Sequence, residues 1–379
     1  MIGEQFYAQG QEDIAVLSAT AGVLTDGYLQ ARLTNPVNFD ALAGKIHETY
    51  ENLEQVISPD GHYAFEITTL NKDAPEGAVV FAATFRSSLG SDRGNAKEIA
   101  DKALRDQRHS YVYLTLPGNG SSGPLTQKER KHIAGTGGFY DLVEGRALPV
   151  VYALRDVLAH RGVAIEHLAS DSTGALFATA LGIVSPKDTI KTVFQNARTG
   201  WRHMSPVVLA KGMLHDEPVF RSIHRTYSPD VLGISEPLLS FVKESTPQPY
   251  KDRQLQPNRS LPTLWAYLYG LARGPEGGND PLVNGMQALV ARQPSTDVLF
   301  VSSEHDVLVR SPTINERLRT VLGAVSLAGG SSVRSVMIAG GSHTTHTYYP
   351  QYVDAIRMTG FGNDNSLVPA QSSYSSGAS

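Results

Sequence analysis

The sequence predicts an α/β fold, in which a mostly parallel β-sheet is covered by helices on both faces. Short runs rich in β-branched and aromatic residues alternate with longer stretches whose apolar residues recur every three or four positions. Strands that alternate with helices pair in parallel through right-handed crossovers, and the crossover helices then cover the sheet. A chain of 379 residues is long enough to bury a large core of this kind.

The composition excludes several classes of protein. The chain has no cysteine, which rules out disulfide bonds, a cysteine nucleophile and thiolate metal sites. Its 33 Lys+Arg and 37 Asp+Glu lack the basic excess expected of a nucleic-acid-binding protein. We find no secretory leader and no apolar run of about 18 residues, so we expect a cytoplasmic protein without a membrane span. The sequence does not indicate the oligomeric state.

Residues 1–60 are expected to form a helical extension that precedes the sheet. Between Gln11 and Ile57, apolar residues three or four positions apart predict two helices. The sequence Ser58-Pro59-Asp60-Gly61 then indicates a turn, after which the pattern becomes that of strands.

Residues 61–198 are predicted to form the first part of the α/β core, and residues 294–360 the second part. In the first part we expect strands His62–Leu70, Gly77–Phe85, Tyr111–Leu116, Val163–Leu168 and Ile190–Gln195, with helices Asn95–Gln107, Phe139–His160 and Ala175–Gly182. In the second part we expect strands Asp297–Ser302 and Ser332–Ile338, with helices Ile314–Leu327 and Pro350–Met358.

Residues 199–293 interrupt this alternation and are expected to form an inserted helical cap. They are dense in proline and aromatic residues and show no clear strand alternation. Within them, the helix-like stretch Leu261–Gly270 is expected either to face a substrate or to form the cap's own core. Residues 361–379 are rich in Ser, Gly and Asn, and we expect this tail to be disordered.

One junction between a predicted strand and a predicted helix carries the candidate nucleophile. Strand Val163–Leu168 leads into Ser170-Asp171-Ser172-Thr173-Gly174. Small residues two positions before and after a serine fit a sharp turn, because larger side chains would collide with the neighbouring strand and helix. The junction follows a middle strand at its carboxyl end, where α/β proteins place their sites. We therefore expect Ser172 to present an exposed hydroxyl; an ordinary serine-rich helix cap is the alternative.

A serine hydroxyl needs a base to activate it, and the base needs an acid to orient it. The predicted strand Asp297–Ser302 is followed by Asp306, our candidate acid. The next predicted strand is followed by Gly340-Gly341-Ser342-His343, in which His343 is our candidate base. Alternatives remain for both residues: Glu304 for the acid, and His346 or His305 for the base.

These segments resemble the α/β-hydrolase superfamily over roughly residues 64–358. Val298–Val309 resembles the family's strand-then-acid segment, Gly340–His343 its Gly-x-Gly-His segment, and Leu116–Ser122 the loop after its fourth strand. The resemblance implies the α/β-hydrolase fold with a cap inserted between core strands. It also implies a cofactor-free serine hydrolase that cleaves a small-molecule carboxylic ester, or an amide or thioester, through an acyl-enzyme.

The same resemblance implies an oxyanion hole. The backbone N–H of Thr173, next to the nucleophile, is the first donor. The family takes its second donor from a His-Gly pair after the third strand, where this chain has Thr84-Phe85-Arg86. Phe85 is our candidate for this donor and Arg86 the alternative. The chain also has Ser170 where the family usually has Gly, and Thr115 where it usually has Asp.

Three other interpretations stay open. Gly118–Gly123 matches the G-x-G-x-x-G pattern of dinucleotide sites, but Pro124–Thr136 is polar and is not expected to form a helix packed on the sheet. A metal hydrolase would draw on His305, Asp306, His343 and His346, although the chain lacks an H-E-x-x-H motif. The third interpretation is a catalytically silent α/β-hydrolase scaffold used for binding or assembly.

Overall fold

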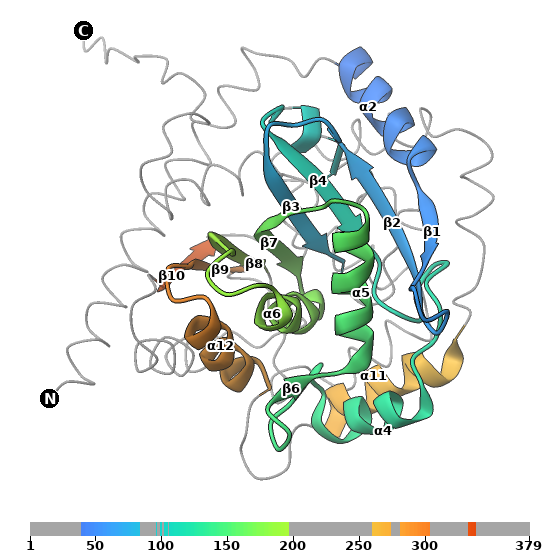
Figure 1. Ribbon diagram of the computed structural model, residues 1–379, viewed down its shortest axis with the longest axis vertical. Coiled ribbons are helices and arrows are strands. Elements are labelled where there is room, and N and C mark those ends of the chain that lie inside the picture. The colour runs from blue at the N-terminus through green and yellow to red at the C-terminus, as the bar shows by residue number, and fades with distance from the viewer. Residues whose placement is uncertain are drawn as a thin grey trace, which may run out of the picture.

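The computed structural model describes residues 39–83, 96, 99–100, 102–104, 106–196, 260–273, 281–303 and 333–338. Within these ranges, eight strands form one sheet in the order β1–β2–β4–β3–β7–β8–β9–β10 (Figure 1). Neighbouring strands from β4 to β10 pair in parallel, whereas β2 is antiparallel to both β1 and β4. The predicted α/β fold with a mostly parallel sheet is confirmed.

Each predicted strand has a counterpart in this sheet within a few residues, and β1 was not predicted. The strands of the sheet are β1 (Glu54–Ile57), β2 (Ala64–Leu70), β3 (Glu76–Ala82), β4 (His109–Leu114), β7 (Ile165–Asp171), β8 (Thr192–Asn196), β9 (Asp297–Ser303) and β10 (Val333–Ile338). The prediction of a helix up to Ile57 is wrong at its end, because residues 54–57 form β1. This short strand pairs with the outer edge of β2, from Glu54 opposite Ile67 to Ile57 opposite Ala64.

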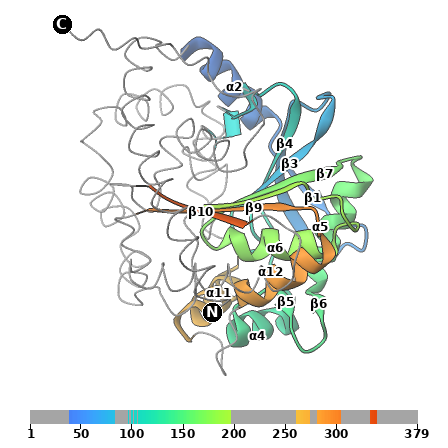
Figure 2. The same cartoon turned by 90° about the vertical axis from the view of Figure 1, so that its left-hand side faces the viewer.

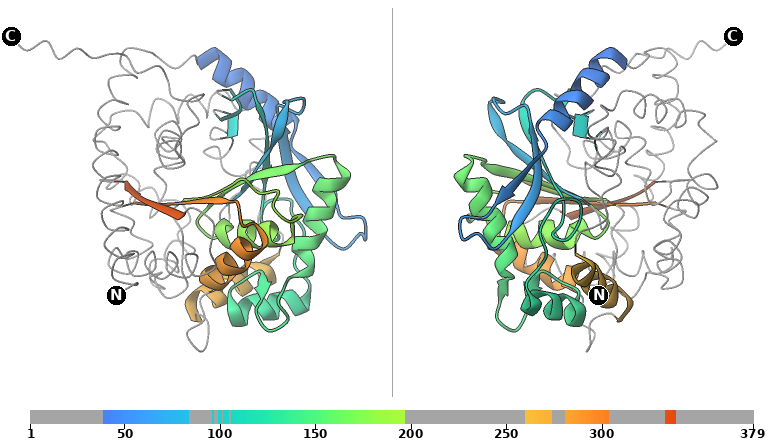
Figure 3. Two further views of the ribbon diagram at one scale, coloured as in Figure 1. Left: turned by 60° about the vertical axis from the view of Figure 1, so that its left-hand side comes forward. Right: turned by 90° about the vertical axis from the view of Figure 1, so that its right-hand side faces the viewer.

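Helices lie on both faces of the sheet. They are α2 (Phe39–Glu51), α4 (Gln127–Thr136), α5 (Pro149–His160), α6 (Gly174–Val184), α11 (Leu261–Arg273) and α12 (Pro281–Arg292). Helices α5, α6 and α12 lie on one face, and α2 lies on the opposite face (Figures 2 and 3). Helix α6 consists of apolar and small residues and is buried on nearly every side, as expected of a helix in the middle of a core.

The predicted helix Phe139–His160 is wrong in its first half. Strands β5 (Tyr140–Asp141) and β6 (Arg146–Ala147) form a hairpin there, and α5 begins only at Pro149. The carboxylate of Asp141 accepts hydrogen bonds from the backbone N–H groups of Val143 and Glu144, which favours a turn over a helix. Proline at the first position of α5 then fixes where the helix starts.

Residues 124–136 were not expected to form a helix packed on the sheet; residues 127–136 do form a helix, α4, and it packs against α11. Helix α4 begins with a capping box, in which Thr126 and Glu129 exchange hydrogen bonds between side chain and backbone. The carboxylate of Glu129 also accepts hydrogen bonds from Tyr63 Oη at 2.8 Å and from Val150 N at 2.9 Å. One buried carboxylate therefore joins the residue before β2, helix α4 and the start of α5.

Two helices from the predicted cap pack against the core. Helix α12 packs against α6, and Gln293 after it bonds the backbone of Gly182, Pro186 and Thr189. Helix α11 packs against α4, and its Tyr267 is 4% exposed and contacts Phe139. The stretch Leu261–Gly270 therefore places its inner face in the main core.

Other predicted segments lie outside the described residues. These are the first predicted N-terminal helix, residues 199–259 of the predicted cap, the predicted helices Ile314–Leu327 and Pro350–Met358, and the tail 361–379. Among the helices that the structure describes, none has the length and apolar character needed to cross a membrane. The cytoplasmic location stays a prediction.

A buried carboxylate fixes the amino end of β4. Asp106 is 5% exposed and lies 2.8 Å from His109 Nδ1 and 2.7 Å from the Tyr111 hydroxyl. His109 Nε2 in turn lies 2.7 Å from Glu76 on the neighbouring strand β3. Burial alone would raise the pKa of Asp106, but hydrogen bonds from His109 and Tyr111 outweigh it and hold the pKa well below its usual range.

We expect Asp106→Asn to lower the free energy of unfolding by about 2 kcal/mol at neutral pH, because buried hydrogen bonds to a charge are lost. The folded-state pKa lies below the unfolded-state value of about 4, so the carboxylate stabilises the fold above that pH and less as pH falls. Urea unfolding should show a difference between the two proteins that shrinks by about pH 3. The exposed Asp73→Asn is the control. A difference that does not change with pH would contradict this account.

Candidate active site

Ser172 lies on a tight turn between β7, which ends at Asp171, and α6, which begins at Gly174. Its φ is 48°, in the left-handed region that L-residues other than Asn and Asp rarely adopt. In the described part of the chain, the other non-glycine residues with positive φ are Asn71 and Asp188, which tolerate this conformation. Holding a serine there costs about 1–3 kcal/mol, and such strain is concentrated at functional sites.

The small residues on either side of Ser172 are required by close packing. A Cβ at Gly174 would lie 2.3 Å from the carbonyl oxygen of Ala82 and 2.6 Å from that of Ala83. Ser170 is fully buried between β3 and β8, where it is paired with Ala82 and Gln195. The turn therefore brings the start of α6 directly against the end of β3, which a larger residue at position 174 would prevent.

Ser172 is enclosed, with 5% of its surface exposed. Little of the residue as a whole is therefore open to solvent, and the exposure of its hydroxyl stays a prediction. The ends of the neighbouring strands lie close on both sides of the turn, because Gly174 approaches β3 while Asp171 is paired with Asn196 of β8. An enclosed serine is partly shielded from water, which strengthens the electrostatic interactions around it.

The turn also determines which groups can stabilise an oxyanion. The backbone N–H of Thr173 lies at the start of α6, where the helix dipole favours negative charge. The N–H of Ala83 already donates to the carbonyl of Leu114 at 3.0 Å, so a donor from β3 must come from a later residue. The candidates Phe85 and Arg86 lie outside the described residues.

The candidate acid and base, Asp306 and His343, also lie outside the described residues, as do Glu304, His305 and His346. The strands that precede them are described. Strands β9 and β10 run parallel to β7 through β8, so their carboxyl ends at Ser303 and Ile338 lie at the same edge of the sheet as Ser172.

A residue that the sequence analysis did not identify holds the loop after β4 at this edge. Glu66 of β2 is 3% exposed, and its carboxylate accepts hydrogen bonds from the Thr115 hydroxyl at 3.0 Å and from the Ser121 hydroxyl and N–H at 2.7 and 2.8 Å. Where the resemblance expects Asp at position 115, this chain therefore supplies a carboxylate from the neighbouring strand. The sequence does carry a sign of this role, because Glu66 is the one charged residue in the strand Ala64–Leu70.

The hydrogen bonds of the glycine-rich loop contradict a dinucleotide site. The N–H groups of Gly118, Asn119, Ser122 and Gly123 donate to backbone carbonyls, and that of Ser121 donates to Glu66. A phosphate-binding loop needs such groups directed at its ligand. In addition, Thr263 of α11 fills the space beside Gly118. In the ranges that the structure describes, no group of histidine and acidic side chains is arranged to hold a metal ion.

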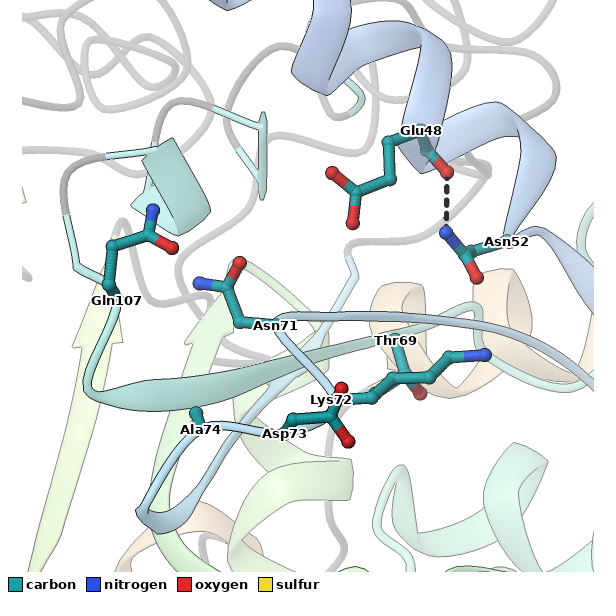
Figure 4. A pocket seen from close by; sticks show the side chains of 8 residues that line it. All are labelled: Glu48, Asn52, Thr69, Asn71, Lys72, Asp73, Ala74 and Gln107. Carbon is teal, nitrogen blue, oxygen red and sulfur yellow. Dashed lines mark hydrogen bonds between the residues drawn. The ribbon is translucent and has the colours of Figure 1, made fainter.

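Two pockets in the described part of the chain lie away from Ser172. One, of about 380 Å³, is lined by polar side chains of α2, the turn after β2 and Gln107, including Glu48, Asn71 and Lys72 (Figure 4). Because this turn lies next to the start of β4, the pocket is at the edge of the sheet opposite Ser172. The other, of about 360 Å³, lies between the turn before β2 and α5.

Comparison with known proteins gives a structural match but no sequence match. No protein-family model matches the chain, and no curated protein is similar to it. A serine hydrolase from the polyaromatic-hydrocarbon-degrading bacterium Cycloclasticus zankles superposes with a TM-score of 0.50 at 9% identity, covering 80% of this chain and 95% of that one. A carboxylesterase from Bacillus subtilis gives a TM-score of 0.45 at 12% identity, covering 85% and 96%.

The chain therefore has the α/β-hydrolase fold. This confirms the fold class that the sequence resemblance implied. The roles of Ser172, Thr173, Phe85, Asp306 and His343 stay predictions, since a likeness at this identity shows the fold alone.

We expect Gly174→Ala to lower the free energy of unfolding by at least about 2 kcal/mol, because its Cβ meets backbone carbonyls that cannot move aside. Gly135→Ala is the matched control: this exposed helical position in α4 has nothing within 4 Å of the new Cβ. It should be neutral or stabilise by up to about 1 kcal/mol. Urea unfolding measures both. Equal stability of Gly174→Ala and the unmodified protein would contradict the packing described.

Proposed function

We propose that the protein is a serine hydrolase that cleaves a carboxylic ester, or an amide or thioester, of a small molecule through an acyl-enzyme. The observation that carries this proposal is the left-handed backbone of Ser172 on a turn that Gly174 packs against β3. A strained serine between a strand and a helix is the nucleophile turn of α/β-hydrolases. The structural similarity to a serine hydrolase adds support.

In the proposed reaction, Ser172 Oγ attacks the substrate carbonyl while His343 accepts the hydroxyl proton. His343 then gives that proton to the leaving group, and Asp306 keeps the imidazole in the required tautomer and stabilises its positive charge. Water repeats the sequence on the acyl-enzyme and releases the acid. Each oxyanion donor, Thr173 N–H and a backbone N–H near Phe85, contributes about 3–4 kcal/mol of barrier reduction. This chemistry uses side chains and backbone alone.

The position of the strands supports this assignment of acid and base. Asp306 follows the last residue of β9, Ser303, and His343 follows the last residue of β10, Ile338, at short distances along the chain. Since the carboxyl ends of β7, β9 and β10 share one edge, short loops suffice to bring the three side chains together.

We expect a fluorophosphonate probe to label the protein and Ser172→Ala to abolish labelling, because the probe reacts with an activated serine hydroxyl. Hydrolysis of p-nitrophenyl esters should fall by at least about 10³-fold in the same variant. Ser295→Ala, at an exposed serine remote from the turn, is the matched control. An unlabelled natural protein, or a Ser172→Ala protein that is labelled equally, would contradict the proposal.

We expect Asp306→Asn to lower kcat by about 10⁴-fold, because His343 would lose the carboxylate that orients its ring and stabilises its positive charge. Glu304→Gln should change kcat by less than about threefold, and circular dichroism should show both variants folded. If Glu304→Gln alone abolishes turnover, the acid is Glu304. If neither change affects turnover, the proposed acid–base pair is wrong.

A further inference from the structure

Exposed apolar side chains gather at one end of the molecule. Of the six large apolar residues that are exposed in the described ranges, five lie on α11 or on the turn between β5 and β6: Leu261, Trp265, Tyr269, Leu142 and Val143. Helix α11, helix α4 and the hairpin lie at the same end in all views (Figures 1, 2 and 3). Scattered exposed apolar residues are normal, but a group of them marks an interaction surface.

On α11 these residues form a single stripe. Leu261, Trp265 and Tyr269 are four positions apart and are 65%, 66% and 53% exposed. The opposite face of the helix, with Leu264 and Tyr267, is buried against the core. The helix therefore has an outward apolar face that its packing does not require.

Helix α4 lies beside α11 and presents positive charge. The two helices are in contact, and Thr263 of α11 accepts a hydrogen bond from Leu125 N just before α4. Lys128 and Lys131 are three positions apart and exposed, so they share the outward face of α4. The acidic residue of this helix, Glu129, is buried and fully hydrogen-bonded.

The remaining charges at this end do not cancel that positive face. Arg130 is partly buried and donates from Nη1 to the carbonyl of Leu125. On the hairpin, Glu144 is paired with Arg146, and Asp141 faces His132. Among the described side chains, the outward surface is therefore apolar on α11 and the hairpin turn, and basic on α4.

We propose that the surface formed by α11, α4 and the turn between β5 and β6 docks onto an anionic lipid surface. Tryptophan, tyrosine and leucine side chains enter the boundary between headgroups and acyl chains, while nearby lysines contact anionic headgroups. The charge argues against a second copy of the chain as the occupant. A two-fold interface centred on this surface would bring Lys128 and Lys131 towards the same lysines of the other copy.

The surface is also connected to the candidate active site. Tyr267 of α11 donates a hydrogen bond to the carbonyl of Pro117 at 3.1 Å, and Thr263 packs on Gly118. Both contacts are made with the loop after β4, at the edge of the sheet where Ser172 lies. Helix α11 therefore joins the proposed docking surface to that edge through its buried face. The proposal does not depend on hydrolysis, and Ser172→Ala should bind lipid as the unmodified protein does.

The test uses tryptophan fluorescence, since the chain has two tryptophans and Trp201→Phe leaves Trp265 as the reporter. This protein is mixed with phosphatidylcholine vesicles with and without phosphatidylglycerol. We expect a blue shift of Trp265 emission, and quenching by lipids brominated on their acyl chains, with the anionic vesicles. Affinity should be at least about tenfold lower with phosphatidylcholine alone or at high salt.

Matched variants separate the two parts of the surface in vesicle flotation. Lys128→Glu with Lys131→Glu should weaken binding by at least about tenfold, whereas Lys72→Glu with Lys187→Glu, at exposed lysines elsewhere, should not. Leu261→Ser should weaken binding by at least about fivefold, since about one apolar side chain leaves the lipid. Ile57→Ser removes another exposed apolar side chain, which lies elsewhere, and should have no effect.

The proposal is overturned if anionic vesicles do not bind, or if the control variants weaken binding as much as the surface variants. Light scattering measures whether the protein self-associates. If the protein does not bind vesicles but self-associates, and Leu261→Ser abolishes the self-association, the surface binds a second copy of the chain. Binding to an acidic peptide without vesicle binding would assign it to an acidic protein partner.

Discussion

The close packing of α6 against β3 is the constraint on which the candidate site depends. Because Gly174 has no side chain, the first turn of α6 approaches the carbonyls of Ala82 and Ala83 directly. The chain must reverse direction within the two residues between β7 and α6, and Ser172 takes up the strain in its left-handed backbone. The contact thus fixes Ser172 at the carboxyl edge of the sheet and points the amino end of a helix towards it.

Buried carboxylates hold the segments around this core. Glu66 ties the loop after β4 to β2, and Glu129 joins the residue before β2 to α4 and α5. Asp106 links β4 through His109 to β3. Each carboxylate is almost fully buried and accepts several hydrogen bonds, which offset the cost of removing a charge from water. The elements that carry the site are therefore positioned by directional contacts in addition to apolar packing.

The sequence predicts the parts of the fold that depend on local pattern. Strands β3, β4 and β7 and helix α6 were predictable because their apolar runs have a clear period, and the small residues around Ser172 indicated the turn. Strand β1 and helix α4 were not predictable in this way. Strand β1 pairs with the edge of β2, and α4 is held by hydrogen bonds from Tyr63 and from the start of α5 to Glu129. The enclosure of Ser172 and the role of Glu66 also depend on strand register, which short-range patterns do not contain.

The strained turn is proposed to present Ser172 as the nucleophile. A crystal structure of the protein treated with an organophosphate would show which residue reacts. We predict phosphorus bonded to Ser172 Oγ, a phosphoryl oxygen within about 3.1 Å of Thr173 N, and a Ser172 φ that stays positive. A phosphorylated residue other than Ser172, or a Ser172 that relaxes to negative φ with no adduct, would contradict this proposal.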